Sequence, residues 1–386
     1  MAATASEKAP LQLSKGMLVK SLVAALWLSF LFLPLAGFSS AVIFFFCAAL
    51  MLILSRFLLK YRSLLTGIMP AARLTGTVFR ERRRMFMLCS FLFAAAVPLF
   101  VGDYYLDVAI LAGIYIILAL GLNVVIGFAG LLNLGFAAFY AIGAYAYALL
   151  HTKVGFGFWT AMPGSLVLTT IAGFLLAVPA LRLRGDYLAI VTLGFGEITR
   201  LILNNWDSLT HGPNGISGIA RPGILDFPLN TLSSFYYLVL CCVIFTLFII
   251  QRVHASRIGR AWIAIREDEI ASSAMGIPAT AYKLYAFAFG AFWASLAGSL
   301  FTAKMQFVSP ESFTFMESVL IVCMVILGGL GSIAGVVIGA LVLVILPEML
   351  REVQLYRMLA LGAGLVLLMI FRPQGLFGGK GVSLRG

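Results

Sequence analysis

Long apolar runs, separated by short polar loops, repeat along almost the whole of this 386-residue chain. Runs of about 17 to 25 apolar residues are long enough to cross a membrane as helices, and roughly eleven such helical segments can be counted. We therefore expect an all-α polytopic membrane protein in which some segments are broken or half helices. The expected spans are 18–36, 41–59, 85–101, 108–128, 132–150, 160–181, 187–203, 234–252, 282–304, the broken segment 316–346, and 355–371.

Composition agrees with this pattern, because 62% of the residues are hydrophobic and 11% are charged. Soluble domains carry about 25% charged residues. The net charge of +12 does not indicate nucleic-acid binding, because Lys and Arg cluster in alternate loops, as retention on the cytoplasmic side requires. The strongest cluster is Lys60, Arg62, Arg73, Arg80, Arg82, Arg83 and Arg84, opposed by the single acid Glu81.

The charged loops define one topology and a domain plan. Placing 60–84 in the cytoplasm puts both termini, loop 182–186 and loop 252–283 inside, and the 204–233 loop outside. The first helix is interpreted as retained, because no convincing signal-peptide cleavage site follows it. The expected parts are a two-helix appendage with a basic linker (1–84), a membrane helix bundle with the cytoplasmic loop 252–283 (85–375) and a cytoplasmic tail (376–386).

The stretch 251–283 is the longest charged interval between spans. Its second half is predicted to be a short helix that Asp268 caps and Gly276 ends. On it Ile270, Ala271, Ala274 and Met275 share one face, which could enter a groove of another protein. The alternative is an ordinary positively charged inner loop, with Arg252, Arg257, Arg260 and Arg266 at the membrane surface.

Residues 121–145 form the first of three glycine-punctuated stretches. Gly127 and Gly130 can break a helix at membrane depth, where Asn123 and Asn133 add polar groups. Irregular backbone in a bilayer must be buried in protein or line a watery path, so this break is a candidate translocation route. The alternative reading is close helix packing, favoured for the later small residues Gly135, Gly143 and Ala144.

Glu197 lies deep in an expected span within the second stretch, 184–206. A carboxylate inside a membrane is costly, which makes it a candidate path residue, and Arg200 at i+3 is its expected partner. The alternative is a pair that only locks two helices together. The following loop, 210–219, is rich in Gly, Pro and Asn and predicts an ordered turn system facing outward.

The third stretch, 324–348, contains a break at Gly328, Gly329 and Gly331 that we expect near the inner face. It weakly echoes the first stretch and hints at duplicated halves. No phosphate-binding G-x-x-x-x-G-K-[ST] motif and no hydrolase or zinc-protease motif occurs in the sequence. The five cysteines lie in apolar segments without metal-ligand spacing. We therefore predict no enzyme activity and no cofactor or metal in this chain.

Taken in order, five motifs resemble those of the LivM-type permeases of bacterial branched-chain amino acid ABC importers. They are GLNVVIGFAGLLNLGFAAFYAIGAY, GDYLAIVTLGFGEITR, THGPNGISGI, GRAWIAIREDEIASSAMGI and GGLGSIAGVVIGAL. The resemblance covers roughly 105–375, and the N-terminal hairpin resembles the extension of many LivM proteins.

This resemblance implies a subunit of the bacterial inner membrane that pairs with a LivH-like permease, two ATP-binding subunits that use ATP and Mg, and a periplasmic substrate-binding protein. It also maps the family's ATPase-coupling segment onto this chain. The matching positions are Arg260, Ala261, Arg266, Glu267, Asp268, Ala271 and Gly276, to which the predicted helix face adds Ile270 and Ala274.

The predicted function is half of a translocation path for leucine, isoleucine and valine, with Asn123, Gly127, Gly130, Asn133 and Glu197 as path residues. Related permeases carry urea or short amides, which is the first alternative. A proton-coupled secondary transporter with Glu197 as the proton carrier is the second, and a passive channel the third.

Overall fold

The computed structural model describes residues 94–99, 101–180, 183, 185–224, 227–228, 231–349 and the single residues 362, 366 and 375. The chain divides into two units, Met1–Tyr105 and Leu106–Gly386, and the fold described below is that of the second. Three sets of expectations lie outside the described residues: the spans 18–36 and 41–59 with most of 85–101 and 355–371, the domain boundary at 84, and the tail 376–386.

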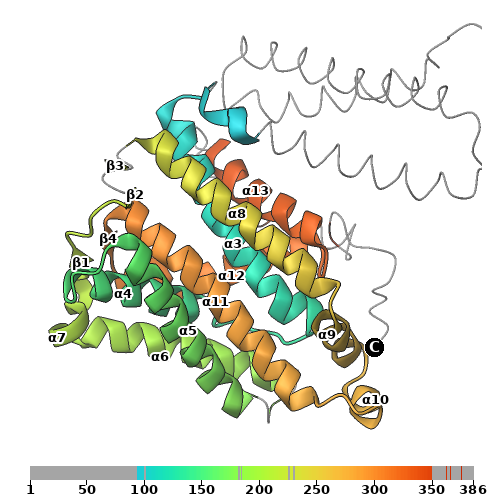
Figure 1. The fold of residues 1–386 in the computed structure, drawn as a ribbon. Helices are drawn as coiled ribbons and strands as arrows, with labels where there is room; N and C mark the ends of the chain where they lie inside the picture. The colour runs from blue at the N-terminus through green and yellow to red at the C-terminus, as the bar shows by residue number, and fades with distance from the viewer. Residues whose placement is uncertain are drawn as a thin grey trace, which may run out of the picture. The chain divides into compact units, whose positions relative to one another are not determined.

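Helices dominate the described part of the chain, which confirms the all-α prediction (Figure 1). Their bounds agree with the expected spans to within a few residues. They are α3 (Asp103–Asn123), continued by the π-helical turn η1 (Val124–Phe128), α4 (Phe136–Thr152), α5 (Phe158–Ala180), α6 (Asp186–Asn205), α8 (Leu232–His254), α11 (Ala279–Met305), α12 (Phe315–Gly328) and α13 (Ile333–Met349).

Four of these helices are long and apolar enough to cross a membrane: Asp103–Phe128, Phe158–Pro179, Leu232–His254 and Ala279–Met305. Two shorter apolar helices follow, Phe315–Gly328 and Ile333–Glu348. The expected break within 316–346 is therefore confirmed. It separates α12 from α13 at the three glycines that the sequence analysis named.

The connection after α6 is ordered, as predicted for 210–219. It forms α7 (Asp207–Thr210), the 3-10 turn η2 (Gly212–Asn214) and β1 (Ile216–Ser217). Strand β1 pairs antiparallel with β4 (Phe307–Val308), and β2 (Gly223–Ile224) pairs with β3 (Phe227–Pro228). A second 3-10 turn, η3 (Pro310–Phe313), leads into α12. These short elements tie the connections after α6 and α11 together.

The core of the unit is α11, which packs against α4 and α5. Small residues permit the close approach: a Cβ added to Gly143 on α4 would lie 2.4 Å from Ser295 Cα on α11. Hydroxyls then bond across the helices, with Ser165 Oγ 2.7 Å from Ser299 Oγ and Thr169 donating to Ser295 Oγ at 3.0 Å. The packing interpretation of Gly143 is thus confirmed.

The start of α4 differs from the prediction. The helix begins at Phe136, whereas residue 132 was expected, and residues 129–135 form an irregular segment inside the bundle. Side-chain acceptors take up backbone N–H groups here. Asn133 Oδ1 accepts the N–H of Gly135 locally at 3.0 Å, and Thr192 Oγ1 on α6 accepts that of Leu134 at 3.1 Å. The expected break is therefore longer than its glycines indicated.

Candidate functional site

Two short helices occupy the charged stretch between α8 and α11. They are α9 (Arg257–Glu267) and α10 (Glu269–Ala274), which lie at one end of the bundle (Figure 1). Asp268 Oδ1 accepts the N–H groups of Ile270 and Ala271, each at 2.9 Å, so the predicted cap is confirmed. The basic half is also helical, which the sequence analysis did not predict.

Buried contacts hold this helix pair on the bundle. Trp262 is 1% exposed and its Nε1–H donates to the carbonyl of Tyr282 at 2.7 Å. Lys283 Nζ lies 2.7 Å from Glu269 Oε1. The sequence analysis missed both anchors, although Ala261, Trp262 and Ile265 recur at helical spacing and could have identified a buried face.

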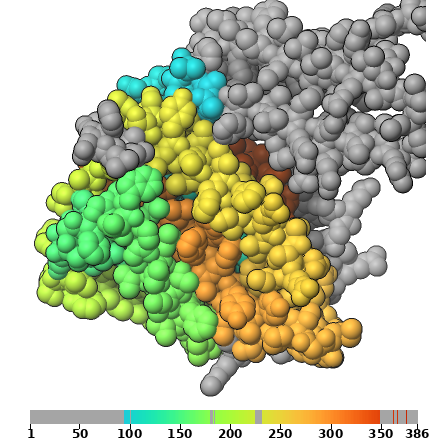
Figure 2. Space-filling model, viewed as in Figure 1, coloured from blue at the N-terminus to red at the C-terminus, as the bar shows by residue number. Residues whose placement is uncertain are grey.

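The opposite side of α10 is open. Ile270 is 72% exposed and Met275 is 83% exposed, and Ala271 and Ala274 between them are exposed as well. All four residues of the predicted stripe therefore lie on the surface. The golden corner that α9 and α10 form is visible in the space-filling view (Figure 2). We call Ile270, Ala271, Ala274 and Met275 the docking face.

The other coupling candidates divide between the surface and the interior. Arg260, Glu267, Asp268 and Gly276 are exposed, whereas Ala261 is 7% exposed and packs inward. The Arg266 side chain, 21% exposed, turns away from the docking face. Its Nη1–H donates to the carbonyl oxygen of Gly127, and Nη2–H donates to Glu267 Oε1 at 2.8 Å.

Arg266 thereby reaches the place where two interrupted helices meet. Asn123 Oδ1, at the end of α3, accepts the N–H of Gly331 at 2.9 Å, so the breaks after α3 and after α12 are bonded to each other. We call Asn123, Gly127, Gly130, Arg266 and Gly331 the break junction. The two glycine motifs that resembled one another in sequence are neighbours in space.

Glycine is required at this junction for two reasons. Gly130 has φ +71°, and a Cβ on it would lie 2.6 Å from Arg266 Cγ. A Cβ on Gly127 would lie 2.1 Å from Asn123 Oδ1 and 2.6 Å from the Gly331 nitrogen. The close approach of the two breaks therefore depends on the missing side chains.

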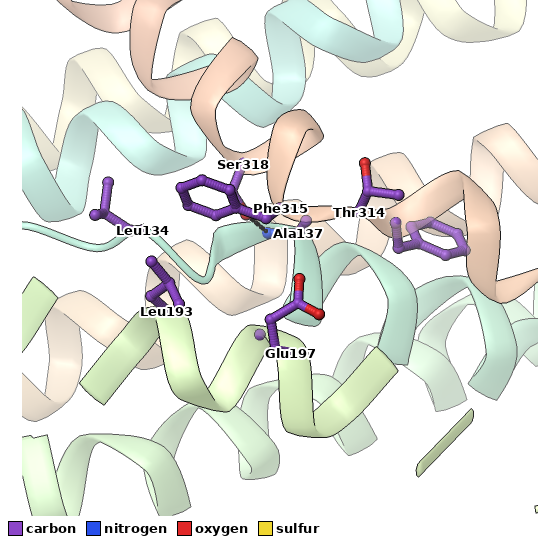
Figure 3. Close-up of a pocket in the computed structure, with 9 residues that line it drawn as sticks. Leu134, Ala137, Leu193, Glu197, Thr314, Phe315 and Ser318 are labelled. Carbon is purple, nitrogen blue, oxygen red and sulfur yellow. Dashed lines mark hydrogen bonds between the residues drawn. The ribbon is translucent and has the colours of Figure 1, made fainter. Parts of the chain in front are cut away.

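A second meeting point surrounds Glu197. The starts of α4 and α12 are joined there by Ala137 N–H, which donates to Ser318 Oγ at 2.9 Å, and Glu197 points from α6 toward them (Figure 3). We call this the Glu197 pocket. It is lined by Leu134, Ala137, Leu193, Gly196, Glu197, Phe313, Thr314, Phe315 and Ser318.

Arg200 is the partner of Glu197, as predicted, with its Nε and Nη2 at 3.0 and 2.9 Å from Glu197 Oε2. Both members belong to α6, and the alternative in which the pair locks two helices together stays a prediction. The Glu197 and Arg200 side chains are 34% and 33% exposed in this chain. The pair is therefore half-buried.

The five predicted path residues fall into two groups. Asn123, Gly127 and Gly130 belong to the break junction, whereas Glu197 lies at the pocket. Asn133 is fully buried beside Leu134, a pocket residue, and its Nδ2 has no hydrogen-bond partner among the described residues. The irregular segment 129–135 connects the two groups.

Two charged residues at the ends of spans were not predicted from the sequence. Glu317 Oε2, in the first turn of α12, accepts a hydrogen bond from the Tyr115 hydroxyl at 3.0 Å. Lys304 Nζ lies 2.9 Å from Asp107 Oδ2, and the Lys304 side chain is 7% exposed. A charge at the very end of an expected span is the signal that could have identified both.

Known proteins share the sequence of this part of the chain. A family described as "Branched-chain amino acid transport system / permease component" matches residues 104–371. The chain belongs to this family. The match includes α9, α10, the break junction and the Glu197 pocket, and it makes the chain a transport permease subunit, not an enzyme. No solved structure matches the chain.

Individual relatives of the family carry related names. The LivM permease protein of a high-affinity branched-chain amino acid transport system in Salmonella typhimurium is 47% identical over 332 residues, which are 80% of this chain and 77% of that protein. LivM of Escherichia coli K12 is 46% identical with the same coverage. LivH of Escherichia coli K12 is 27% identical over 289 residues, 69% of this chain and 92% of LivH.

Proposed function

We propose that this chain forms half of the translocation path for leucine, isoleucine and valine in an ATP-driven importer of the bacterial inner membrane. The names of the LivM relatives support the substrate class. The similarity to LivH, another permease with a related sequence, supports a second permease as the other half. Both termini of the chain would lie in the cytoplasm, together with α9 and α10.

The observation that carries the coupling part of this proposal is the docking face. Apolar side chains at 72% and 83% exposure, separated by exposed alanines, suit insertion into a groove of another protein. The helix that carries them is capped by Asp268 and pinned by Lys283. An ATP-binding subunit that holds this face could therefore displace α9 and α10 as a unit when it binds and hydrolyses ATP with Mg.

The Glu197 pocket is our candidate for the substrate route. The charged groups of an amino acid zwitterion need polar protein groups beside them inside the membrane. The starts of α4 and α12 present partial positive charge near the Glu197 carboxylate. The half-buried Glu197 and Arg200 pair would be costly against lipid, so its face of α6 requires protein or water beside it. A second permease against that face would enclose the route.

The test is uptake of labelled leucine, and separately of urea, into proteoliposomes that contain this chain with its co-expressed partners and binding protein. We expect ATP-dependent leucine uptake that requires every component. Urea uptake without leucine uptake would support an ATP-driven importer and contradict branched-chain amino acids as its substrate. Leucine uptake by the chain alone would contradict the ATP-driven mechanism.

The docking face has its own test. Ala274→Glu places a charge between Ile270 and Met275, and it should abolish co-purification of the ATP-binding subunits. The matched control is Ala220→Glu in the exposed loop after β1, which should leave co-purification unchanged. Normal association of the Ala274→Glu variant would exclude the docking face as the contact.

A further inference from the structure

Arg266 belongs by sequence to the coupling segment, yet its contacts belong to the interior of the bundle. Its guanidinium donates to the Gly127 carbonyl, 139 residues away in the chain. Its aliphatic stem lies over Gly130, where an added Cβ would be 2.6 Å from Arg266 Cγ. One side chain of α9 thus contacts both Gly127 and Gly130 in the turn that ends the α3–η1 helix.

The second break is within reach of the same group. A Cβ on Gly331 would lie 3.2 Å from Arg266 Nη1, and the Gly331 N–H donates to Asn123 Oδ1 at 2.9 Å. The linked chain of groups runs from Arg266 through Gly127 and Asn123 to Gly331. A displacement of α9 cannot leave either break unaffected while these contacts persist.

The neighbours of Arg266 explain why this contact can be switched. Glu267 also binds the guanidinium, through Nη2, and is itself 61% exposed at the end of α9, two residues before α10 begins. Arg266 therefore bridges an exposed acid beside the docking face and a carbonyl in the bundle. A partner that moves or pairs with Glu267 would alter the position of the guanidinium. The N–H donors of this planar group have fixed relative positions, so its hydrogen bonds to Gly127 and Glu267 cannot adjust independently.

We propose that Arg266 is the positioning residue that transmits movement of α9 and α10 to both helix breaks. With Arg266 on the Gly127 carbonyl, the turn at 127–130 and the link at 329–331 are held together and the path is closed at this end. Withdrawal of Arg266 frees the two breaks to separate. This inference rests on the proposed function, since it assumes that partner subunits pull on the docking face.

The test compares three variants in the assembled transporter in proteoliposomes, with leucine uptake and ATP hydrolysis measured on the same samples. Arg266→Gln removes the charge and the fork, and Arg266→Lys retains the charge alone. Arg257→Gln, an exposed arginine at the start of the same helix, is the matched control.

We expect Arg266→Gln to keep its partner subunits and to hydrolyse ATP within about twofold of the native rate, while leucine uptake per ATP falls roughly ten- to hundredfold. That range is the effect of losing one charge-assisted hydrogen bond. Arg266→Lys should fall between Arg266→Gln and the native chain, and Arg257→Gln should match the native ratio.

Three results would overturn the inference. An unchanged ratio in Arg266→Gln would show that the contact transmits nothing. A parallel loss of uptake, hydrolysis and folded protein would make the residue structural, and loss of the ATP-binding subunits would place it on the docking face. Failure of the proposed function is distinguishable, because then the native assembly itself would show no ATP-dependent leucine uptake.

Discussion

The break junction and the Glu197 pocket both lie where helices begin or end inside the bundle. They differ in the sign of their charged side chain, which is a cation at the junction and an anion at the pocket. At the junction the cation is Arg266 of α9, whose side chain is 21% exposed. At the pocket the anion Glu197 comes from α6 and is half-buried, at 34% exposure. The contrast is between a cation that bonds to a backbone carbonyl of a helix break and an anion that lines a pocket.

A physical link joins the two sites. Helix α12 starts at the pocket with Phe315 and Ser318 and ends beside the junction at Gly328. The irregular segment 129–135 runs from Gly130 at the junction to Leu134 and Gly135 at the pocket. Three substitutions would sharpen or break the comparison between these sites.

The largest effect is expected for Gly127→Ala at the junction. The added methyl group would meet Asn123 Oδ1 and the Gly331 nitrogen, so we expect a loss of about 1–3 kcal/mol of unfolding free energy. The matched control is Gly194→Ala on α6, where a Cβ meets nothing within 4 Å. Thermal unfolding of the purified chain in detergent measures both. Equal stability of the two variants would mean that the breaks are not tightly packed.

The next effect concerns the charge at the pocket. Glu197→Gln keeps the shape and removes the anion, so leucine uptake should fall by about tenfold while partner association and unfolding temperature remain near native values. Uptake assays with co-purification and thermal unfolding separate these properties. Unchanged uptake would remove Glu197 from the route, whereas a lowered unfolding temperature would assign the residue to stability.

The smallest effect is expected for Ser318→Ala, which removes the acceptor of the Ala137 N–H at the start of α4. Loss of one neutral hydrogen bond costs about 1 kcal/mol of unfolding free energy, and the change leaves the charge of Glu197 in the pocket unaltered. Ser318→Cys changes the polarity of the side chain less than Ser318→Ala and is the comparison variant. Thermal unfolding and leucine uptake are measured for both. If Ser318→Ala lowered leucine uptake as much as Glu197→Gln does, the Glu197 charge would not be the main contribution of the pocket to uptake.

Much of the fold could be predicted because it depends on local features of the sequence. Apolar runs predicted the long helices, glycines predicted both breaks, and the carboxylate at 268 predicted the cap of α10. The start of α4 was placed four residues early, because the bond from Gly135 N–H to Asn133 Oδ1 competes with helix formation in a way that hydropathy does not reveal.

The candidate sites were less predictable because they depend on tertiary contacts. The arginines of 251–266 were interpreted as surface charge, and only the folded chain brings Arg266 to Gly127. The pairing of Glu197 with Arg200 followed from helical spacing alone. Its position beside the starts of α4 and α12 required three separate segments to meet, which no spacing along the chain specifies.

The shortness of α12 also affects the electrostatic barrier of the membrane. At 1.5 Å per residue, its 14 residues span about 21 Å, whereas the hydrocarbon layer is about 30 Å thick. If the junction lies at one boundary of that layer, the helix start at the pocket lies roughly 10 Å short of the other. A zwitterion entering from that side would cross about a third of the apolar thickness before it reached the helix dipoles and the carboxylate at the pocket. The loss of its hydration water would then be divided between the path before the pocket and the path after it.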